Sequence, residues 1–272
     1  MSAERFERAR FDARLATRRL GRTLIVREEA GSTNDVAWDA LAEGLPDGVT
    51  VIAEAQVAGR GRAGRRWVMA PGRGLALSVA LHPGCDRRQT GALPLVAGLA
   101  LARALDGFGV AAALKWPNDL LVNGRKLSGI LAESRRLAAR DGSAIEAVVI
   151  GVGVNVGERA EDFPDDLRAT ATSLALEGAN VAREDVAAAL LNALEPLWTE
   201  LQEGSRDAVL DAWRRRAAFW GRTVAAHTPG GTLHGVAHDL DADGALLLRL
   251  DDGRIVPVVA GDVVPAGAEH GA

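Results

Sequence analysis

Residues 59–67 read Gly-Arg-Gly-Arg-Ala-Gly-Arg-Arg-Trp, a glycine-punctuated segment that carries four arginines. It follows closely on the apolar, β-branched run at residues 49–53, which is typical of a strand. Glycine lets the backbone adopt positive φ and come close to a ligand, and arginine presents a permanent forked charge that suits carboxylate and phosphate oxygens. The segment therefore predicts a loop that binds an anion.

The common phosphate-binding loops do not account for this segment. Gly59, Gly61 and Gly64 have the spacing of a dinucleotide fingerprint, but that motif needs a helix directly after it. Residues 67–74 are instead rich in turn formers and lead into a strand-like run at residues 75–81. A Walker loop would close with Gly-Lys-Ser/Thr, and a protein kinase would contain His-Arg-Asp and Asp-Phe-Gly, and the sequence has none of these.

The composition is that of an ordinary globular protein of 272 residues, with 48% hydrophobic and 25% charged residues and a formal net charge of −4. This length allows one large domain and a small one. The slightly acidic balance disfavours a protein that binds nucleic acid along its surface, so the basic chemistry is local. We therefore expect no nucleic-acid partner.

Cysteine, histidine and the N-terminal segment exclude further classes. The single cysteine, Cys85, excludes an internal disulfide, and we assign it no role because nothing in the sequence places a base near it. The five histidines form no metal-binding pair. Residues 1–19 lack the apolar core of a signal peptide, and no uncharged stretch reaches the roughly 18 to 20 residues of a membrane span. We expect a cytoplasmic protein with no membrane partner.

Residues 1–220 are predicted to form one domain of strands and helices. Strands are expected at residues 22–26, 49–53, 75–81, 120–126, 127–133 and 147–156. Helices are expected from residues 32–34 onward, over residues 90–105, and over residues 186–201 and 206–219. Asn123-Gly124 is typical of a two-residue hairpin turn, and residues 147–156 are expected to be the central strand.

Residues 221–272 are predicted to form a second, small domain. Short strands are expected at residues 222–224, 233–236, 245–250 and 255–258. Asp243-Gly244 and Asp252-Gly253 supply turns between them. Evenly spaced short strands of this kind predict a small β-barrel.

Four motifs follow one another along the chain. They are Gly31-Ser32-Thr33-Asn34, the loop from Gln56 to Trp67, Lys115-Trp116-Pro117-Asn118-Asp119-Leu120 with Lys-Leu-Ser-Gly-Ile-Leu at residues 126–131, and Gly-Val-Gly-Val-Asn-Val at residues 151–156. From about residue 25 to the C-terminal strands this combination resembles biotin protein ligase. One departure is Ala63, where the family usually has a basic or polar residue, so that position is not expected to be needed for the chemistry.

The resemblance implies an α+β fold: a catalytic domain like those of class II aminoacyl-tRNA synthetases and biotin ligases, with a mixed sheet flanked by helices, then a small SH3-like β-barrel. It also implies a two-step reaction, in which biotin and ATP, with Mg²⁺, give biotinyl-5′-AMP and pyrophosphate. A lysine of a biotin carboxyl carrier protein then takes the biotinyl group. The first step brings two anions together, so fixed positive charge is required. Arg62 and Lys126 are the expected catalytic residues.

The resemblance and the residue types together predict the binding residues. Contacts with biotin or its adenylate are expected from Ser32, Thr33, Asn34, Gln56, Gly59, Arg60, Gly61, Arg62, Lys126, Gly129 and Gly153. Contacts with the nucleotide are expected from Arg65, Trp67, Asn118, Asp119 and Asn155, with Asp119 a ligand for Mg²⁺. Plainer roles stay open: a helix cap for residues 32–34, core packing for Trp67, a turn cap for residues 118–119 and a solvated hairpin for Lys126.

Three further expectations concern activity and assembly. About 20 residues precede the first expected strand, too few for a winged helix-turn-helix, so a ligase without repressor activity is expected. The alternatives are a lipoate or octanoate ligase, which resembles this fold, and a non-catalytic biotin sensor. The resemblance further implies a possible homodimer and an arginine loop that becomes ordered when the adenylate binds.

Overall fold

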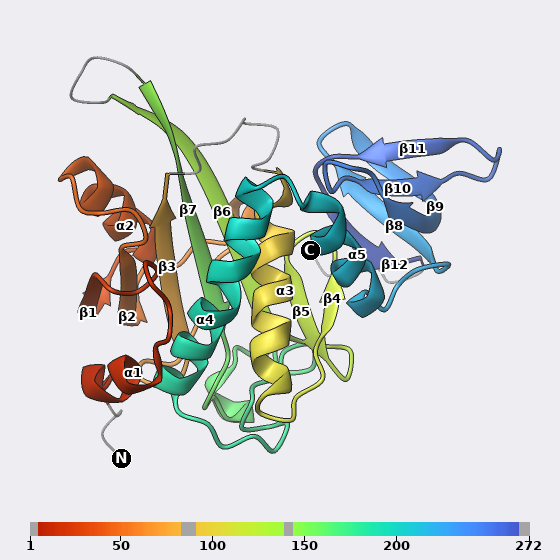
Figure 1. Ribbon diagram of the computed structural model, residues 1–272. Helices are drawn as coiled ribbons and strands as arrows, with labels where there is room; N and C mark the ends of the chain where they lie inside the picture. The colour runs from red at the N-terminus through yellow and green to blue at the C-terminus, as the bar shows by residue number, and fades with distance from the viewer. Residues whose placement is uncertain (1–4, 83–90, 139–143, 267–272) are drawn as a thin grey trace.

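The computed structural model describes residues 5–82, 91–138 and 144–266, and its main body is a seven-stranded mixed sheet (Figure 1). The strand order is β1-β2-β3-β7-β6-β5-β4, in which β1 and β2 are parallel and every other pair is antiparallel. The strands are β1 (Leu24–Ala30), β2 (Thr50–Gln56), β3 (Leu75–Leu81), β4 (Ala113–Lys115), β5 (Asp119–Val122), β6 (Arg125–Ala138) and β7 (Ala144–Val154). The expected central strand, β7, is confirmed.

Helices cover the two faces of this sheet unequally. One face packs against α1 (Arg8–Arg14), α3 (Leu93–Asp106), α4 (Arg183–Gln202) and α5 (Arg206–Arg216), of which α3 and α4 lie side by side in Figure 1. Among the described helices, α2 (Thr33–Ala42) packs against the other face, through residues such as Val51 and Val149. Because side chains alternate along a strand, Ile150 and Val152 enter the first core, and Gly151 and Gly153 face the α2 side. That side of β6 and β7 is therefore left open for a site.

The C-terminal residues form a second, five-stranded antiparallel sheet with the order β11-β10-β9-β8-β12. Its strands are β8 (Thr223–Thr228), β9 (Gly231–Leu240), β10 (Leu246–Arg249), β11 (Ile255–Val258) and β12 (Asp262–Pro265). Val224, Ala226 and Leu246 belong to the same buried cluster as the helices. Trp116 Nε1 also donates to the carbonyl of Gly244 at 3.0 Å, so the two sheets are packed together. The division of the chain near residue 220 stays a prediction.

Most of the predicted elements are present, and the differences have local causes. The hairpin is confirmed, since Asn123 and Gly124 have φ of 51° and 77°. The helix α1 and the strands β4 and β12 were not predicted. The helix α1 is short and rich in arginine, β4 has three residues, and β12 has four residues that end in proline. Cys85 and the start of the 90–105 prediction lie outside the described residues. Among the described helices, none has the length and apolarity to cross a membrane.

Candidate active site

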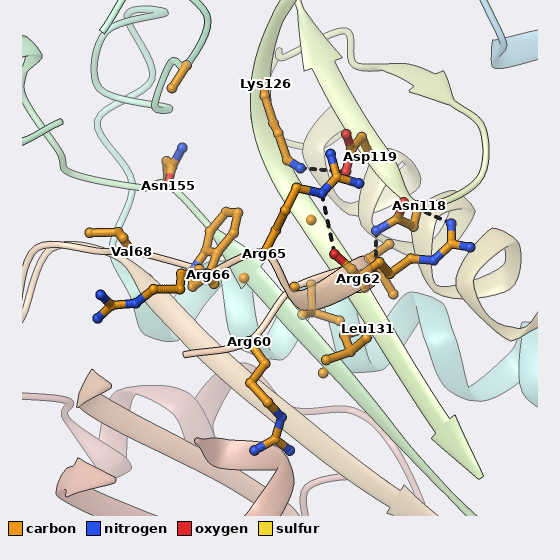
Figure 2. A pocket seen from close by; sticks show the side chains of 18 of the residues that line it. Arg60, Arg62, Arg65, Arg66, Val68, Asn118, Asp119, Lys126, Leu131 and Asn155 are labelled. Atoms are coloured by element: carbon orange, nitrogen blue, oxygen red, sulfur yellow. Dashed lines mark hydrogen bonds and ion pairs between the residues drawn. The ribbon is translucent and has the colours of Figure 1, made fainter. Parts of the chain in front are cut away.

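A pocket of about 460 Å³ lies on the α2 side of the sheet, between the arginine loop (residues 59–67) and β5, β6 and β7 (Figure 2). The predicted site residues that line it are Ser32, Thr33, Asn34, Gln56, Arg60, Gly61, Arg62, Arg65, Trp67, Asn118, Asp119, Lys126, Gly129, Gly153 and Asn155. Gly59 instead lines a second hollow, across the arginine loop from the first. The structure therefore brings together residues from four separate motifs.

The floor of the pocket is made of glycines. A Cβ at Gly151 would overlap the amide oxygen of Asn34, and a Cβ at Gly153 would overlap the indole of Trp67. A Cβ at Gly129 would lie 3.3 Å from the same indole. The sheet is bare here, so α2 and the loop can approach the backbone directly. In this conformation Trp67 takes the space over Gly129 and Gly153 that was expected to receive the ligand.

The end of the pocket at the start of α2 is polar and buried. Thr33 donates from its backbone N–H and its hydroxyl to Gln56 Oε1, at 2.8 and 3.2 Å. Ser78 Oγ lies 2.7 Å from both Thr33 Oγ1 and Asn34 Oδ1. Ser32 occupies the N-cap position as expected, but the structure gives it no side-chain cap bond among the described residues. Ser32 also lines the pocket.

Ser78 and Glu133 belong to this network, and sequence reasoning missed both. Glu133 Oε2 accepts from Asn34 Nδ2 at 3.0 Å and from Trp38 Nε1 at 3.1 Å, which fixes the amide of Asn34. Ser78 is the one hydroxyl-bearing residue in an otherwise apolar strand, and that contrast is a usable signal. Glu133 carries no such signal, because it follows the matched motif at residues 126–131 as one charge among several.

Arg60 is held by carboxylates on the side of the arginine loop nearest α2. Its guanidinium donates to both oxygens of Asp35, at 2.5 and 2.8 Å, and lies 3.5 Å from Glu133 Oε1. The hydrogen bond to Asp35 raises the pKa of Arg60, and the same bond lowers the pKa of Asp35. Figure 2 shows this guanidinium pointing away from Lys126 and Asp119. Arg60 therefore fastens the loop to α2 in this conformation.

Arg62, by contrast, is half-buried and has no carboxylate within ion-pair distance among the described residues. Its Nη1 lies 3.4 Å from Asn118 Oδ1 and 3.4 Å from the carbonyl of Gly261, both neutral acceptors. Burial lowers the pKa of Arg62, and the charges of Asp262 and Asp119 offset this only in part. A half-buried cation with weak neutral partners is poised to bind an anion.

Two more cations flank Arg62, each paired with a carboxylate. Lys126 Nζ lies 2.7 Å from Asp119 Oδ1 (Figure 2). Arg65 Nη1 lies 2.9 Å from Asp262 Oδ2. Lys115 Nζ lies 3.6 Å from the other oxygen of Asp262. Asp262 belongs to β12, so its role was missed together with that strand. These cations can hold a carboxylate beside phosphates when Asp119 and Asp262 shift or exchange partners.

Asn118 and Asp119 could bind Mg²⁺, but a full set of ligands would also need substrate phosphates and waters. Asn118 Nδ2 donates to the carbonyl of Ile130 at 2.8 Å, which leaves Asn118 Oδ1 facing the pocket beside Asp119. Within residues 5–82, 91–138 and 144–266, no cluster of three His, Cys, Asp or Glu side chains could hold a metal ion. Mg²⁺ commonly binds through one or two protein oxygens together with substrate phosphates and waters, and Asn118 and Asp119 fit that pattern.

The far end of the pocket has one buried donor and one buried acceptor without partners. Asn155 Nδ2 donates to the carbonyl of Thr172 at 2.8 Å, and its Oδ1 has no hydrogen-bond partner among the described residues. The indole N–H of Trp67 is likewise buried and unpaired there. Because unpaired buried polar atoms are costly, this end fits a flat ligand that offers both an acceptor and a donor. Phe163 and Leu167 add apolar walls that the sequence did not reveal.

Two family models match the chain. Residues 28–155 match the biotin/lipoate A/B protein ligase family, and residues 219–264 match the biotin protein ligase C terminal domain. The first range holds the arginine loop and both lysines of the chain, and the second holds Asp262.

Curated relatives and solved structures agree with these matches. A biotin--[acetyl-CoA-carboxylase] ligase of Mycobacterium tuberculosis is 39% identical over 254 residues, which cover 89% of each chain. The bifunctional ligase/repressor BirA of Bacillus spizizenii is 33% identical over 241 residues, covering 88% of this chain and 73% of that protein. The biotin protein ligase from Aquifex aeolicus in complex with biotin and ATP aligns with a TM-score of 0.74 at 26% identity, covering 89% of this chain and 98% of that chain.

Proposed function

We propose that this chain, which belongs to the biotin protein ligase family, joins biotin to a lysine of a biotin carboxyl carrier protein at the expense of ATP. The observation that carries the proposal is one pocket with a buried polar end, a glycine floor, and the cations Arg62 and Lys126. These features suit three parts of biotinyl-5′-AMP, which are the ureido ring, the apolar chain and the phosphate.

The polar end suits the ureido ring of biotin. A ureido group offers two N–H donors and one carbonyl acceptor, and Ser32, Thr33, Asn34 and Gln56 bring side chains of both kinds. A lipoate head group, a dithiolane ring, makes no such hydrogen bonds and would leave buried polar atoms unpaired. This favours biotin over the lipoate and octanoate alternative.

The cationic end suits the first reaction. A carboxylate oxygen of biotin attacks the α-phosphorus of ATP, the bond to the β-phosphate oxygen breaks, and pyrophosphate leaves. Arg62 and Lys126 lie where both anions would meet, and their fixed charge would stabilise the negative charge that accumulates in the transition state. Mg²⁺, held by Asn118, Asp119 and the phosphates, would supply further positive charge.

The unpaired atoms at the far end suit the adenine. Asn155 Oδ1 could accept from the exocyclic amine, and the indole of Trp67 offers its N–H to a ring nitrogen and an apolar wall. In the second reaction the carrier lysine attacks the carbonyl of the mixed anhydride and AMP leaves. Lys126 would then balance the charge on the departing phosphate.

We also propose, as less direct consequences, that the chain is not a repressor and that it can form a homodimer. The formal net charge of −4 disfavours binding to DNA phosphates. Sequence-specific binding to operator DNA at physiological salt would contradict the first point. β1 is the edge strand of the main sheet, where a second copy could pair, and light scattering at increasing concentration tests this.

The experiment that tests the function is intact mass measurement of a biotin carboxyl carrier domain after incubation with the protein, ATP, Mg²⁺ and biotin. We expect a gain of one biotinyl group, slowed by about 10² to 10³ in Lys126→Ala. Arg103→Ala is the matched control, because Arg103 is an exposed cation on α3, on the opposite face of the sheet. Biotin binding without any gain of mass would support the non-catalytic sensor instead.

A further inference from the structure

One carboxylate behind the pocket wall joins two segments that carry the site. Glu177 accepts from Asn123 Nδ2 at 2.7 Å, from Arg125 Nη2 at 2.8 Å and from Thr172 Oγ1 at 2.5 Å. Its side chain is 8% exposed, and it does not line the pocket. Burial tends to raise the pKa of Glu177, but hydrogen bonds from Thr172 and Asn123 and the charge of Arg125 lower it overall. The carboxylate is therefore ionised at neutral pH.

The segment at residues 170–172 holds the backbone of Lys126. The N–H of Lys126 donates to the carbonyl of Thr170 at 2.7 Å, and its carbonyl accepts from the N–H of Thr172 at 2.9 Å. Lys126 also follows Arg125 directly in the hairpin that Glu177 holds. The lysine side chain therefore starts from a backbone that Glu177 restrains both through Thr172 and through the hairpin.

The same segment holds the side chain of Asn155. The carbonyl of Thr172 can only accept a hydrogen bond, so the Asn155 NH₂ group faces it, at 2.8 Å. This leaves Asn155 Oδ1 as the unpaired buried acceptor in the pocket. Thr172 thus contacts two residues that line the pocket, Lys126 through its backbone N–H and Asn155 through its carbonyl.

We propose that Glu177 is a positioning residue for biotin adenylation, which sets Lys126 and Asn155 relative to each other through Thr172 and the hairpin turn. The inference rests on the function proposed above. Adenylation requires a biotin carboxylate oxygen to be held about 3 to 3.5 Å from the α-phosphorus, in line for attack, while the base fixes the other end of the nucleotide. A misplacement of about 1 Å can cost about 10²-fold in rate. A carboxylate outside the pocket can therefore govern the rate without touching substrate.

Three variants and a control test this role. Glu177→Ala removes all three hydrogen bonds. Glu177→Gln keeps one oxygen for Thr172 and Arg125, and Asn123 can turn its amide to accept from the new NH₂ group. Thr172→Val removes only the hydroxyl bond and leaves the backbone bonds to Lys126 and Asn155 in place. Glu161→Ala is the matched control, because Glu161 is exposed and its ion pair with Arg159, at 3.9 Å, lies outside this network.

The measurement is biotin-dependent ATP–pyrophosphate exchange, normalised to active sites by the burst of adenylate. For Glu177→Ala we expect a fall of about tenfold in kcat and a rise of about tenfold in KM for ATP, with KM for biotin within about twofold of wild type. Glu177→Gln should recover most of the loss. Thr172→Val should change kcat and KM for ATP in the same direction but by less. The double variant Glu177→Ala/Thr172→Val should be within about twofold of Glu177→Ala, because both substitutions remove the hydrogen bond between these two side chains.

Two results would overturn the proposal while leaving the proposed function intact. One is an active Glu177→Ala enzyme whose normalised kcat and KM for ATP match wild type. The other is a lower burst amplitude with unchanged kinetic constants, which indicates a role in folding alone. Absence of exchange in wild-type protein is a different outcome, since it removes the proposed function and this inference together.

Discussion

Arg60 and Arg62 are two residues apart in one loop, and the structure gives them opposite surroundings. Arg60 is bidentate to Asp35 and near Glu133, and these carboxylates raise its pKa. Arg62 has two neutral acceptors at 3.4 Å, and burial lowers its pKa. The first charge is already neutralised, and the second is not.

The difference separates a structural arginine from a functional one. An ion pair that already has good geometry gains little from a further anion, so Arg60 acts mainly by fastening the loop to α2. A half-buried and weakly compensated cation such as Arg62 gains much more when a carboxylate or phosphate binds. Sequence alone treats both residues as equal members of one motif.

Replacing each arginine with alanine should separate these roles most strongly. We expect Arg62→Ala to lower kcat/KM for biotin adenylation by about 10² to 10³, because a preorganised charge at the reacting groups is lost. Arg60→Ala should lower it by about tenfold or less, mainly through KM, because the loop loses its attachment to Asp35 and the chemistry keeps its cations. Pyrophosphate exchange at saturating and limiting ATP measures both.

Similar losses of kcat in Arg60→Ala and Arg62→Ala would contradict the assignment of a structural role to Arg60 and a functional role to Arg62. Asp35→Asn serves as the control, since it weakens the same attachment and leaves both arginines in place. It should follow Arg60→Ala and not Arg62→Ala.

The sequence predicts the parts of this contrast that are local in the chain. The arginine loop, the hairpin that carries Lys126 and the glycine strand are contiguous motifs, and each forms the element expected of it. The partners that distinguish the arginines come from elsewhere: Asp35 from α2, Glu133 from a later part of β6, and Gly261 from the loop before β12. Register and packing between distant segments decide which cation meets which anion, and no motif encodes that.

Two carboxylates away from the arginine loop, the half-buried Glu54 and the buried Glu158, show the same contrast. Glu54 is satisfied by Arg183, 2.6 Å away. Glu158 is 1% exposed, and neither of its oxygens has a hydrogen-bond partner among the described residues. Burial raises the pKa of Glu158 to about 7. A Cβ at Gly74 would overlap this carboxyl, so it lies directly under the segment that follows Trp67.

Glu158 should make stability depend on pH. Its folded pKa is raised from an ordinary 4.5 to about 7, so its favourable neutral form is fully present below about pH 4.5, and stability is lost as pH rises through 7. At 1.36 kcal/mol per pH unit the loss is about 3 kcal/mol. Glutamine does not ionise, so we expect Glu158→Gln to lack this loss. Between pH 5 and pH 8.5 the free energy of unfolding of wild type should therefore fall, relative to that of Glu158→Gln, by most of the about 3 kcal/mol. Urea denaturation at both pH values measures it.

A constant difference between the two proteins across this range would show that Glu158 is paired when charged. Glu203→Gln, an exposed carboxylate just after α4, is the control and should show no such trend.

The smallest expected effect concerns the counter-ion that the C-terminal sheet supplies. Burial tends to raise the pKa of Asp262, but the charges of Lys115 and Arg65 lower it overall, so it is ionised at neutral pH. Asp262 therefore neutralises part of the positive charge of Arg65 and Lys115, which would otherwise attract the phosphates of ATP. Asp262→Asn should lower KM for ATP by about two- to fivefold, as expected for one partly exposed pair, and the effect should shrink in high salt. Asp252→Asn, which breaks an exposed pair in the same sheet, should leave KM unchanged. A higher KM for ATP in Asp262→Asn would mean that this carboxylate holds the loop in its binding conformation, and Arg65 would then belong with Arg60 and not with Arg62.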